Sequence, residues 1–123
     1  MPYEISISDH FAAAHFLDGY EGKCENVHGH NFVVSVVCRV EETDDIGIGL
    51  DFKILKQHLG AITSQLDHIN LNEFSGLEGQ NPTAENLARY IYYKLDESLK
   101  ATPAKVNRVT IFESDKYSAT YFK

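Results

Sequence analysis

The 123-residue chain carries 11 lysine and arginine residues against 18 aspartate and glutamate residues, for a net charge of −7, and 43% of its residues are hydrophobic. This length and apolar share are typical of one domain with its own core and argue against intrinsic disorder. The acidic balance argues against nucleic-acid binding, which needs a basic face. No apolar run approaches the roughly 20 residues of a membrane span, no signal peptide is visible, and only two cysteines are present. We therefore expect one domain over residues 1–123, located in the cytoplasm and not in a membrane.

Alternating hydrophobic and polar residues dominate the first part of the chain. Residues 3–16 open with such alternation and are predicted to form a strand. A glycine-containing loop over 17–27 follows, and β-branched residues with a period of two then predict a strand over 28–42. After a turn at 43–45, alternating apolar residues predict a returning strand over 46–50.

Helical periodicity begins after this strand. Asp51 is a suitable N-cap for a helix whose apolar residues recur at steps of three and four. These apolar residues are Phe52, Leu55, Leu59, Ile62 and Leu66. After a loop over 69–81, a second helix is expected to begin at Pro82-Thr83, with Thr83 as its N-cap, and to end before Pro103.

Two more strands are predicted in the last part of the chain, over 106–113 and 118–122, joined by a turn at 114–116. The predicted order is therefore β-β-β-α-α-β-β. Because no crossover helix separates the strands of each hairpin, they should pair antiparallel, with both helices covering one face of the sheet. The expected fold class is α+β.

A histidine pair opens the strand predicted over 28–42. At their i, i+2 spacing, His28 and His30 point to the same face of a strand, about 7 Å apart along the chain. Alone, such a pair is more typical of a solvated or hydrogen-bonded surface. His15, at the end of the neighbouring strand, can supply a third imidazole, and neutral imidazoles suit zinc. Three histidines with an open fourth position would form a metal site of the catalytic kind.

The two cysteines differ in their surroundings. Cys24 stands four residues before His28, in the predicted loop. A thiol there can bind the metal, act as a base or nucleophile, or have no chemical role. Cys38 shares the apolar parity of its strand and is expected in the core.

Three other polar residues are candidates for chemistry. Asp67 and His68 directly follow the first predicted helix. An aspartate can fix the tautomer of a histidine base, and equally a histidine is simply favourable at a helix end. Glu113 continues the apolar face of the strand over 106–113, where it either reaches solvent or binds a guanidine-like edge through two parallel hydrogen bonds.

Five motifs, taken together and in order, identify a family resemblance over essentially the whole chain. The motifs are Phe11-x-Ala13-Ala14-His15, Cys24-x-x-x-His28-Gly29-His30, Leu66-Asp67-His68-x-x-Leu71-Asn72, Pro82-Thr83-x-Glu85-Asn86 and Phe112-Glu113. They resemble the 6-pyruvoyltetrahydropterin synthase family. The resemblance implies the tunnelling fold (T-fold), in which paired hairpins carry two helices and assemble around a barrel. It also implies a homohexamer, a dimer of trimers, with active sites at subunit interfaces.

The resemblance also implies a role for individual residues. His15, His28 and His30 match the three ligands of the family's Zn²⁺ cofactor. Cys24 matches the catalytic thiol, which accepts a proton. The relay partners of that thiol, often supplied across a subunit interface, match Asp67 and His68.

Substrate binding in the family carries over to two further positions. Glu113 matches the glutamate that anchors the 2-amino and N3 edge of the pterin and is sometimes counted in the proton relay. Thr83 matches a residue of the pterin pocket. The small-molecule substrate implied is 7,8-dihydroneopterin triphosphate.

The branch of the family is indicated by the spacing of one motif. Three residues separate Cys24 from His28, as in the bacterial 6-carboxy-5,6,7,8-tetrahydropterin synthases of queuosine biosynthesis. These lyases release acetaldehyde and triphosphate. The alternatives are pyruvoyl-forming activity, or a dual activity in which Glu25 also supports formation of 6-hydroxymethyldihydropterin for folate. A non-catalytic zinc- or pterin-binding module is a further, weaker reading.

Overall fold

The computed structural model describes residues 2–19, 26–77 and 79–123. The elements in chain order are β1 (Tyr3–His15), β2 (His28–Val40), α1 (Phe52–Leu66), the single 3₁₀ turns η2 (Leu71–Glu73) and η3 (Ser75–Leu77), α2 (Ala84–Ser98), β3 (Lys105–Phe112) and β4 (Ser118–Phe122). The four strands form one sheet in the order β1-β2-β3-β4, and every neighbouring pair is antiparallel. The predicted α+β class is confirmed.

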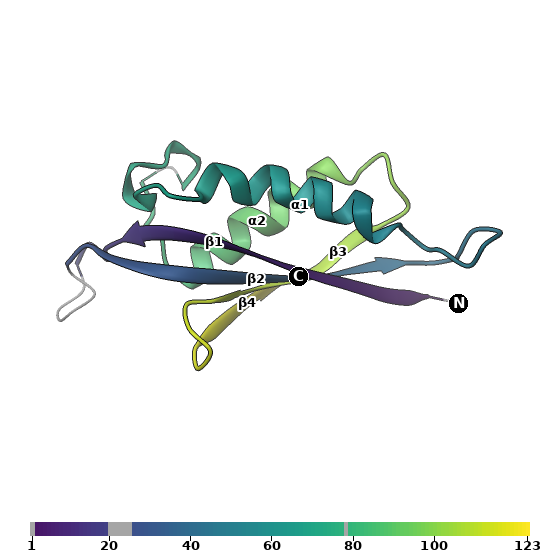
Figure 1. Cartoon of the computed structure of the whole chain (residues 1–123), viewed down its shortest axis with the longest axis horizontal. Coiled ribbons are helices and arrows are strands. Elements are labelled where there is room, and N and C mark those ends of the chain that lie inside the picture. Colours follow the sequence, from purple (N-terminus) through teal and green to yellow (C-terminus); the bar gives the residue numbers. More distant parts are fainter. Residues whose placement is uncertain (1, 20–25, 78) are drawn as a thin grey trace.

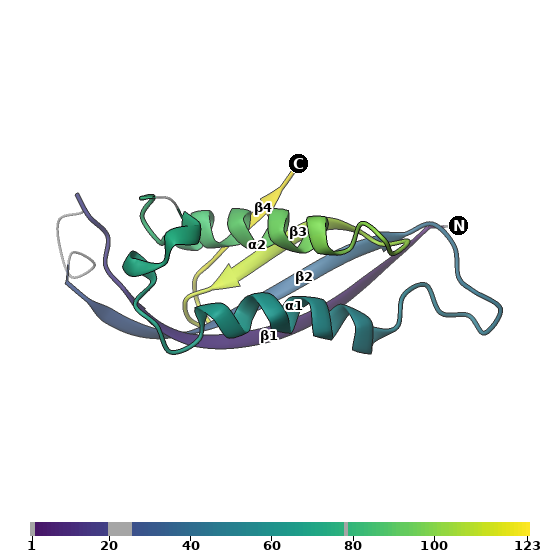
Figure 2. The ribbon, with the colours of Figure 1, turned by 90° about the horizontal axis from the view of Figure 1, so that it is seen from above.

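Both helices cover the same face of this twisted sheet, as predicted (Figure 1). Seen from above, α1 and α2 run in opposite directions along the strands (Figure 2). The N-caps are also those predicted: the side chain of Asp51 accepts from the amide of Lys53 at 2.9 Å, and that of Thr83 accepts from the amide of Asn86 at 3.1 Å. Within the described residues, no helix has both the length and the apolar character needed to cross a membrane.

The core lies between the sheet and the two helices. Apolar residues at steps of four along α2 and its C-cap are completely buried: Leu87, Ile91, Leu95 and Leu99. The stripe of α1 is buried from Leu55 onward, but Phe52 is 61% exposed. Phe52 lies in the first turn of the helix, where it borders a surface cavity with Tyr3 and Ile48.

Shortening a core leucine should cost much of the stability of the fold. We expect Leu95→Ala to lower the free energy of unfolding by about 2–5 kcal/mol, because it removes buried methyl groups and leaves a cavity. Urea titration at one fixed protein concentration measures this change. Phe52→Ala is the matched control on the exposed turn, and its free energy of unfolding should change far less. Equal losses in the two variants would contradict this description of the core.

The strand predicted over 46–50 is absent from the structure, which has a turn and loop there. The carboxylate of Asp44 accepts from the amides of Ile46 and Ile48 at 3.0 and 2.9 Å, and this local bonding competes with a strand ladder. Gly47 adopts φ +85°, which a continuous strand does not permit. The observed order is therefore β-β-α-α-β-β.

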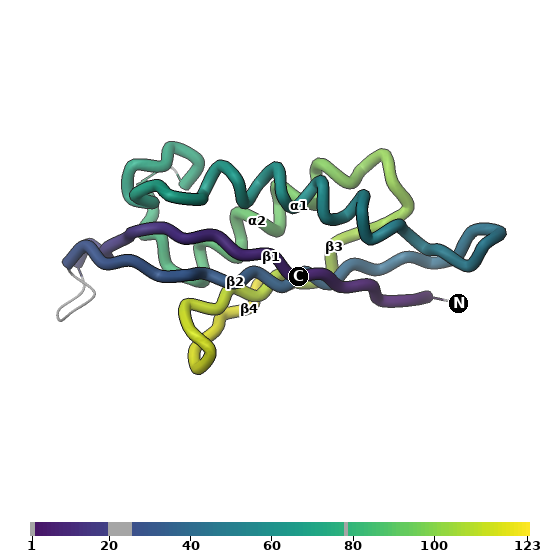
Figure 3. The backbone as a smooth tube through the Cα atoms, viewed as in Figure 1, coloured from purple at the N-terminus to yellow at the C-terminus, as the bar shows by residue number. Residues whose placement is uncertain are grey.

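One end of the molecule gathers the segments that carried the sequence motifs. The end of β1, the start of β2 and the connection between α1 and α2 lie at the same end in the backbone trace (Figure 3). The connection is attached to the outer edge of β1, because the amide of Ala14 donates to the carbonyl of Ile69 at 3.0 Å. Residues 67–70 thus extend the sheet beyond β1 for a short distance.

Candidate functional site

Three histidines come together where β1 ends and β2 begins. His15 pairs directly with His28 in the β1–β2 register, and His30 lies opposite Ala13, so all three side chains emerge from the same face. Their ring centroids are 4.5–5.2 Å apart. One ligating nitrogen from each ring lies within 4.8 Å of the others, a separation at which one metal ion could contact all three.

The hydrogen bonds of these rings fit a metal. The Nδ1–H of His15 donates to the carbonyl of Pro82 at 2.7 Å, and the Nδ1–H of His28 donates to the carbonyl of Asn26 at 2.7 Å. In each neutral ring this leaves Nε2 unprotonated, with its lone pair available. The Nε2 of His15 is buried and has no hydrogen-bond partner in the part of the chain that the structure describes. An unpartnered buried nitrogen beside two other imidazoles is what a three-histidine metal site provides.

Burial favours the neutral form of His15. The ring is 1% exposed, and desolvation lowers its pKa, although the Pro82 carbonyl and the Glu113 carboxylate act in the opposite direction. Phe32 forms the apolar floor of the site: its ring makes edge contacts with His15 and His30 and stacks on Phe11 at 5.0 Å. The three imidazoles therefore sit at the margin of the core, with His15 buried and His28 and His30 partly exposed.

Asp67 and His68 form a pair, although they are adjacent in the sequence. The Oδ2 of Asp67 lies 2.9 Å from the Nδ1 of His68, and its Oδ1 accepts from the amide of Ala12 at 2.8 Å. His68 reaches this position by adopting φ +59°, and its own amide donates to the Ala12 carbonyl. The Ala12 amide, and then the His68 ring, lower the pKa of Asp67. The pair is thus held on the outer edge of β1, with the Nε2 of an 81% exposed His68 facing outward.

A shallow cavity of about 480 Å³ adjoins His68. It is lined by Ala12, Ala13, Ala14, Gly29, His30, Asn31, His68 and Ile69. By strand alternation, the side chains of Ala12, Ala14 and Asn31 point to the face opposite the three site histidines. His68 is absent from the aromatic contacts that join those histidines within the described residues. His30 and His68 thus border one cavity, while the ring contacts of the cluster join only His15, His28 and His30.

Glu113 and Thr83 lie on the cluster's side of the sheet. Glu113 directly follows β3 and not, as predicted, within it; the residue is half-buried, and its carboxylate is near enough to His15 to raise the pKa of that ring. It lines a small cavity of about 170 Å³ with Ala84 and Tyr117. The Thr83 hydroxyl is engaged as the helix cap, as described above. Residues 82–84 thus connect the histidine cluster to the Glu113 cavity.

Cys24 and Glu25 lie outside the described residues, so their predicted roles stay predictions. Cys38 is completely buried in the core, as expected, and burial raises the pKa of its thiol to about 12. A thiol with that pKa is protonated at neutral pH and makes a poor nucleophile.

Two asparagines beside the site were given no role by the sequence reasoning, although Asn72 stands in one of the five motifs. Asn72 and Asn81 each use both ends of the side-chain amide to bind the backbone just after His15, at Phe16 and Asp18 respectively. Both fall in the segment predicted only as a loop. For Asn81 the one sequence signal is that asparagine is typical of loops that bind neighbouring backbone.

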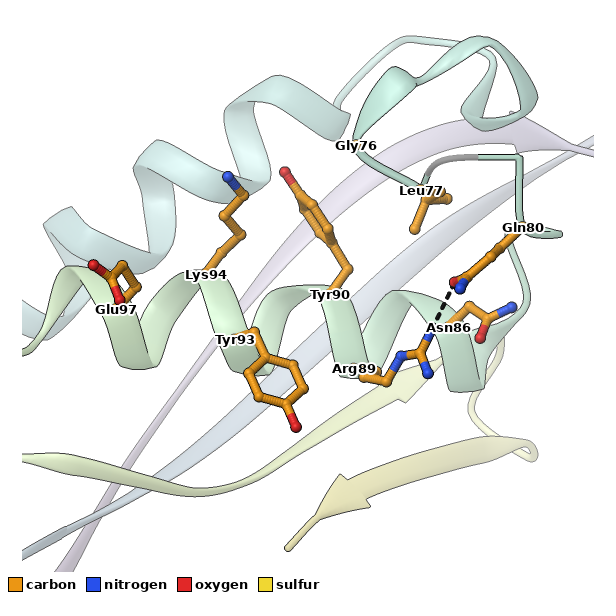
Figure 4. Close-up of a pocket in the computed structure, with 9 residues that line it drawn as sticks. All are labelled: Gly76, Leu77, Gln80, Asn86, Arg89, Tyr90, Tyr93, Lys94 and Glu97. Atoms are coloured by element: carbon orange, nitrogen blue, oxygen red, sulfur yellow. Dashed lines mark hydrogen bonds between the residues drawn. The ribbon is translucent and has the colours of Figure 1, made fainter.

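A second groove runs along α2, between this helix and the segment over 76–80 (Figure 4). It has a volume of about 480 Å³, and its lining includes Arg89, Tyr90, Tyr93 and Lys94. The guanidinium of Arg89 donates to the side chain of Gln80 at 2.7 Å. No residue predicted from the sequence to take part in the chemistry lines this groove.

Comparison with known proteins decides the family. The family model described as 6-pyruvoyl tetrahydropterin synthase matches residues 4–123. The chain belongs to this family. The 6-pyruvoyl tetrahydropterin synthase from Caenorhabditis elegans has a solved structure that matches this synthase-family chain with a TM-score of 0.86 and 32% identity, over 100% of this chain and 96% of that one. The expected T-fold is thereby confirmed.

Curated relatives of this tetrahydropterin synthase chain carry different activities in their names. A Synechocystis protein named 6-carboxy-5,6,7,8-tetrahydropterin synthase is 38% identical over 117 residues, which cover 91% of this chain and 87% of that protein. A Pyrococcus furiosus protein named dihydroneopterin monophosphate aldolase is 34% identical, over 87% of this chain and 86% of that protein. The family is thus an enzyme family acting on pterins, and membership alone does not select the reaction.

Proposed function

We propose that this chain is a zinc-dependent 6-carboxy-5,6,7,8-tetrahydropterin synthase acting on 7,8-dihydroneopterin triphosphate in queuosine biosynthesis. The observation that carries the proposal is the three-histidine cluster, in which the buried Nε2 of His15 has no partner among the described residues. The similarity to the Synechocystis relative and the short spacing between Cys24 and His28 support the carboxy-forming branch.

The proposed reaction balances without an external oxidant or reductant. The substrate and one water give 6-carboxytetrahydropterin, acetaldehyde and triphosphate. The side-chain carbon attached to the ring is kept and oxidised to the carboxylate, and the two outer carbons leave as acetaldehyde. The electrons released by this oxidation reduce the pterin ring and the terminal carbon of the side chain, which loses triphosphate. The protein therefore has only to move protons and to orient the substrate's side chain. Amino-acid side chains and one metal ion can do both.

His15, His28 and His30 would hold the zinc ion through imidazole nitrogens. When bound, zinc supplies Lewis-acid chemistry that lowers the pKa of the substrate's side-chain hydroxyls and orients them. Glu113 would accept hydrogen bonds from the 2-amino and N3 edge of the pterin through both carboxylate oxygens. Thr83 directly precedes Ala84, which lines the Glu113 cavity, and would lie at the edge of the pterin pocket.

Proton transfer would fall to Cys24, Asp67 and His68. The thiolate of Cys24 would accept a proton from the substrate side chain, and the outward Nε2 of His68 would act as general acid and base. Asp67 holds the opposite nitrogen of that ring and so sets which nitrogen carries the proton. All three proton-transfer groups are thus side chains of this protein.

An assembly of several copies would complete the site. In one chain the Asp67–His68 pair is bound to Ala12 at the outer edge of β1, with the exposed ring of His68 available to another copy. Because β1 and β4 are the outer strands of the sheet, they are the edges through which copies could pair. We propose a homohexamer, formed as a dimer of trimers, in which His68 of one subunit serves the zinc site of another.

Product analysis tests this function directly. Zinc-loaded protein is incubated with 7,8-dihydroneopterin triphosphate, and the pterins and acetaldehyde are identified by mass spectrometry. A carboxypterin with equimolar acetaldehyde supports the proposal, and a pyruvoyl product contradicts the branch. A hydroxymethyl product would instead support a role for Glu25 in an aldolase-like reaction, the activity in the name of the Pyrococcus relative. Absence of turnover would favour a binding module.

Loss of the Cys24 thiol should abolish turnover without disturbing the metal. We expect Cys24→Ala to lower kcat by about 10²–10⁴-fold, the range for a positioned proton-transfer group. Zinc content and assembly should stay at the wild-type level, since the three histidines are intact. Cys38→Ala is the control: its thiol lies in the core, so stability should fall but turnover per folded molecule should persist. Full activity of Cys24→Ala would remove the proposed role.

A further inference from the structure

The orientation of His15 depends on one polar contact. Within the described part of the chain, its Nδ1 donates to the Pro82 carbonyl, and its Nε2 has no partner. The side chain is too buried for solvent to replace that acceptor. The direction of the Nε2 lone pair is therefore set by the position of the Pro82 carbonyl.

Pro82 cannot anchor that carbonyl through its own backbone nitrogen, because proline has no N–H. The preceding residue, Asn81, makes the contacts instead. Its Oδ1 accepts from the amide of Asp18 at 3.0 Å, and its Nδ2 donates to the carbonyl of Asp18 at 2.9 Å. Its main-chain carbonyl accepts from the side chain of Asn86 and from the amide of Thr83, each at 2.9 Å. Both the side chain and the carbonyl of Asn81 are thus fixed.

These contacts form a closed hydrogen-bond network, or circuit, beside the metal site. Asp18 follows His15 by three residues, Asn81 binds Asp18 on both backbone groups, and Pro82 next to Asn81 binds the His15 ring. A bidentate amide resists both sliding and rotation of the two segments, because either movement breaks one of its two bonds. The Asn86 bond ties the same circuit to α2.

We propose that Asn81 is a positioning residue for the zinc site: it holds the Pro82 carbonyl under His15 and thereby fixes the tautomer and direction of that imidazole. This inference rests on the proposed function, since it assumes that zinc is the ion bound. Partners that orient a metal-binding histidine typically change metal affinity by about 10–100-fold. Asn81 acts one step further out, through the carbonyl of its neighbour.

Asn72 provides a matched control. Its amide binds the same segment in the same bidentate way, with Oδ1 accepting from the amide of Phe16 at 2.8 Å and Nδ2 donating to its carbonyl at 3.0 Å. Asn72→Ala therefore removes as many side-chain hydrogen bonds from the segment after His15 as Asn81→Ala does. It leaves the Pro82 segment and its contacts in place.

The test measures zinc affinity by chelator competition in the wild-type chain and both variants. Asn81→Ala is expected to weaken zinc binding by about 10–100-fold, whereas Asn72→Ala should stay near the wild-type affinity. The ¹⁵N NMR shifts of His15 in metal-free protein should report the Nδ1–H tautomer in the wild type and a mixture in Asn81→Ala. Should Asn81→Ala fail to fold, Asn86→Ala removes one of the two donors to the Asn81 carbonyl and should weaken zinc binding in the same direction.

The possible results distinguish a failure of the positioning role of Asn81 from a failure of the proposed function. Equal losses in Asn81→Ala and Asn72→Ala, or wild-type affinity in Asn81→Ala or its substitute, overturn the positioning role and leave the zinc enzyme intact. A wild-type chain that binds no zinc refutes the proposed function instead. In that case the His15 tautomer still decides whether Asn81 orients the ring: a mixture in Asn81→Ala supports it, and an unchanged tautomer overturns it.

Discussion

Replacing His28 with alanine is expected to remove both zinc and turnover. His28 lies opposite His15 in the strand register, and its ring contacts both other histidines, so the variant leaves only two imidazoles at the site. We expect zinc affinity to fall by more than about 100-fold, since even indirect orienting partners change affinity by up to that factor. Metal analysis after gel filtration and the rate of carboxypterin formation measure the two effects.

The control for this variant is another histidine outside the cluster. His58 lies on α1, and its Nδ1 donates to the hydroxyl of Ser98 on α2 at 3.0 Å. His58→Ala should retain stoichiometric zinc and wild-type turnover, with a small loss of stability from the missing link between the helices. If His28→Ala keeps full zinc occupancy, the three histidines are not the ligand set.

The second large effect is expected from Asp67→Asn. The amide oxygen can still accept from the Ala12 amide, but the amide nitrogen then faces the Nδ1 of His68. Two donors cannot share a hydrogen bond, so the ring should shift its proton to Nε2 and lose its outward acceptor. We expect kcat to fall by about 10²–10⁴-fold, the usual contribution of a general acid–base group. Zinc content should be unchanged, because the cluster lies elsewhere in the chain.

Steady-state kinetics and ¹⁵N NMR of the His68 ring check this prediction together. Asp45→Asn is the matched control, since it removes the same charge from an exposed residue of the loop after β2. A variant with a changed tautomer and normal kcat would show that His68 is not the proton-transfer group. Normal kcat with an unchanged tautomer would show that Asp67 does not orient it.

The strongest periodicities in the sequence were sufficient to predict most of the fold. Leucine and isoleucine at steps of three and four identified α1 and α2, and the capping residues Asp51 and Thr83 fixed where they begin. Local patterns succeed there because helix caps and apolar stripes depend on neighbours within one or two turns. The strand predicted over 46–50 failed for a related reason. Its alternation is real, but the Asp44 carboxylate satisfies those amides locally.

The candidate site residues also divide into those that the sequence could predict and those that it could not. His28 and His30 could be paired from the sequence, because i, i+2 spacing on a strand determines which face they share. Adding His15 required only the antiparallel pairing of two neighbouring strands. The sequence could not predict that Asp67 and His68 face each other, since adjacent residues do so only when the backbone adopts an unusual conformation such as the positive φ of His68.

The amino-acid sequence by itself determined the two helices, the long β1–β2 hairpin, the histidine set and the family resemblance, all of which depend on residue types at short or fixed spacings. Only the tertiary structure decided what orients the histidines of the site. The Pro82 carbonyl reaches His15 across 67 residues, and Asn81 binds Asp18 across 63. Contacts between segments so far apart follow from how the whole sheet and helices pack, and no local pattern encodes them.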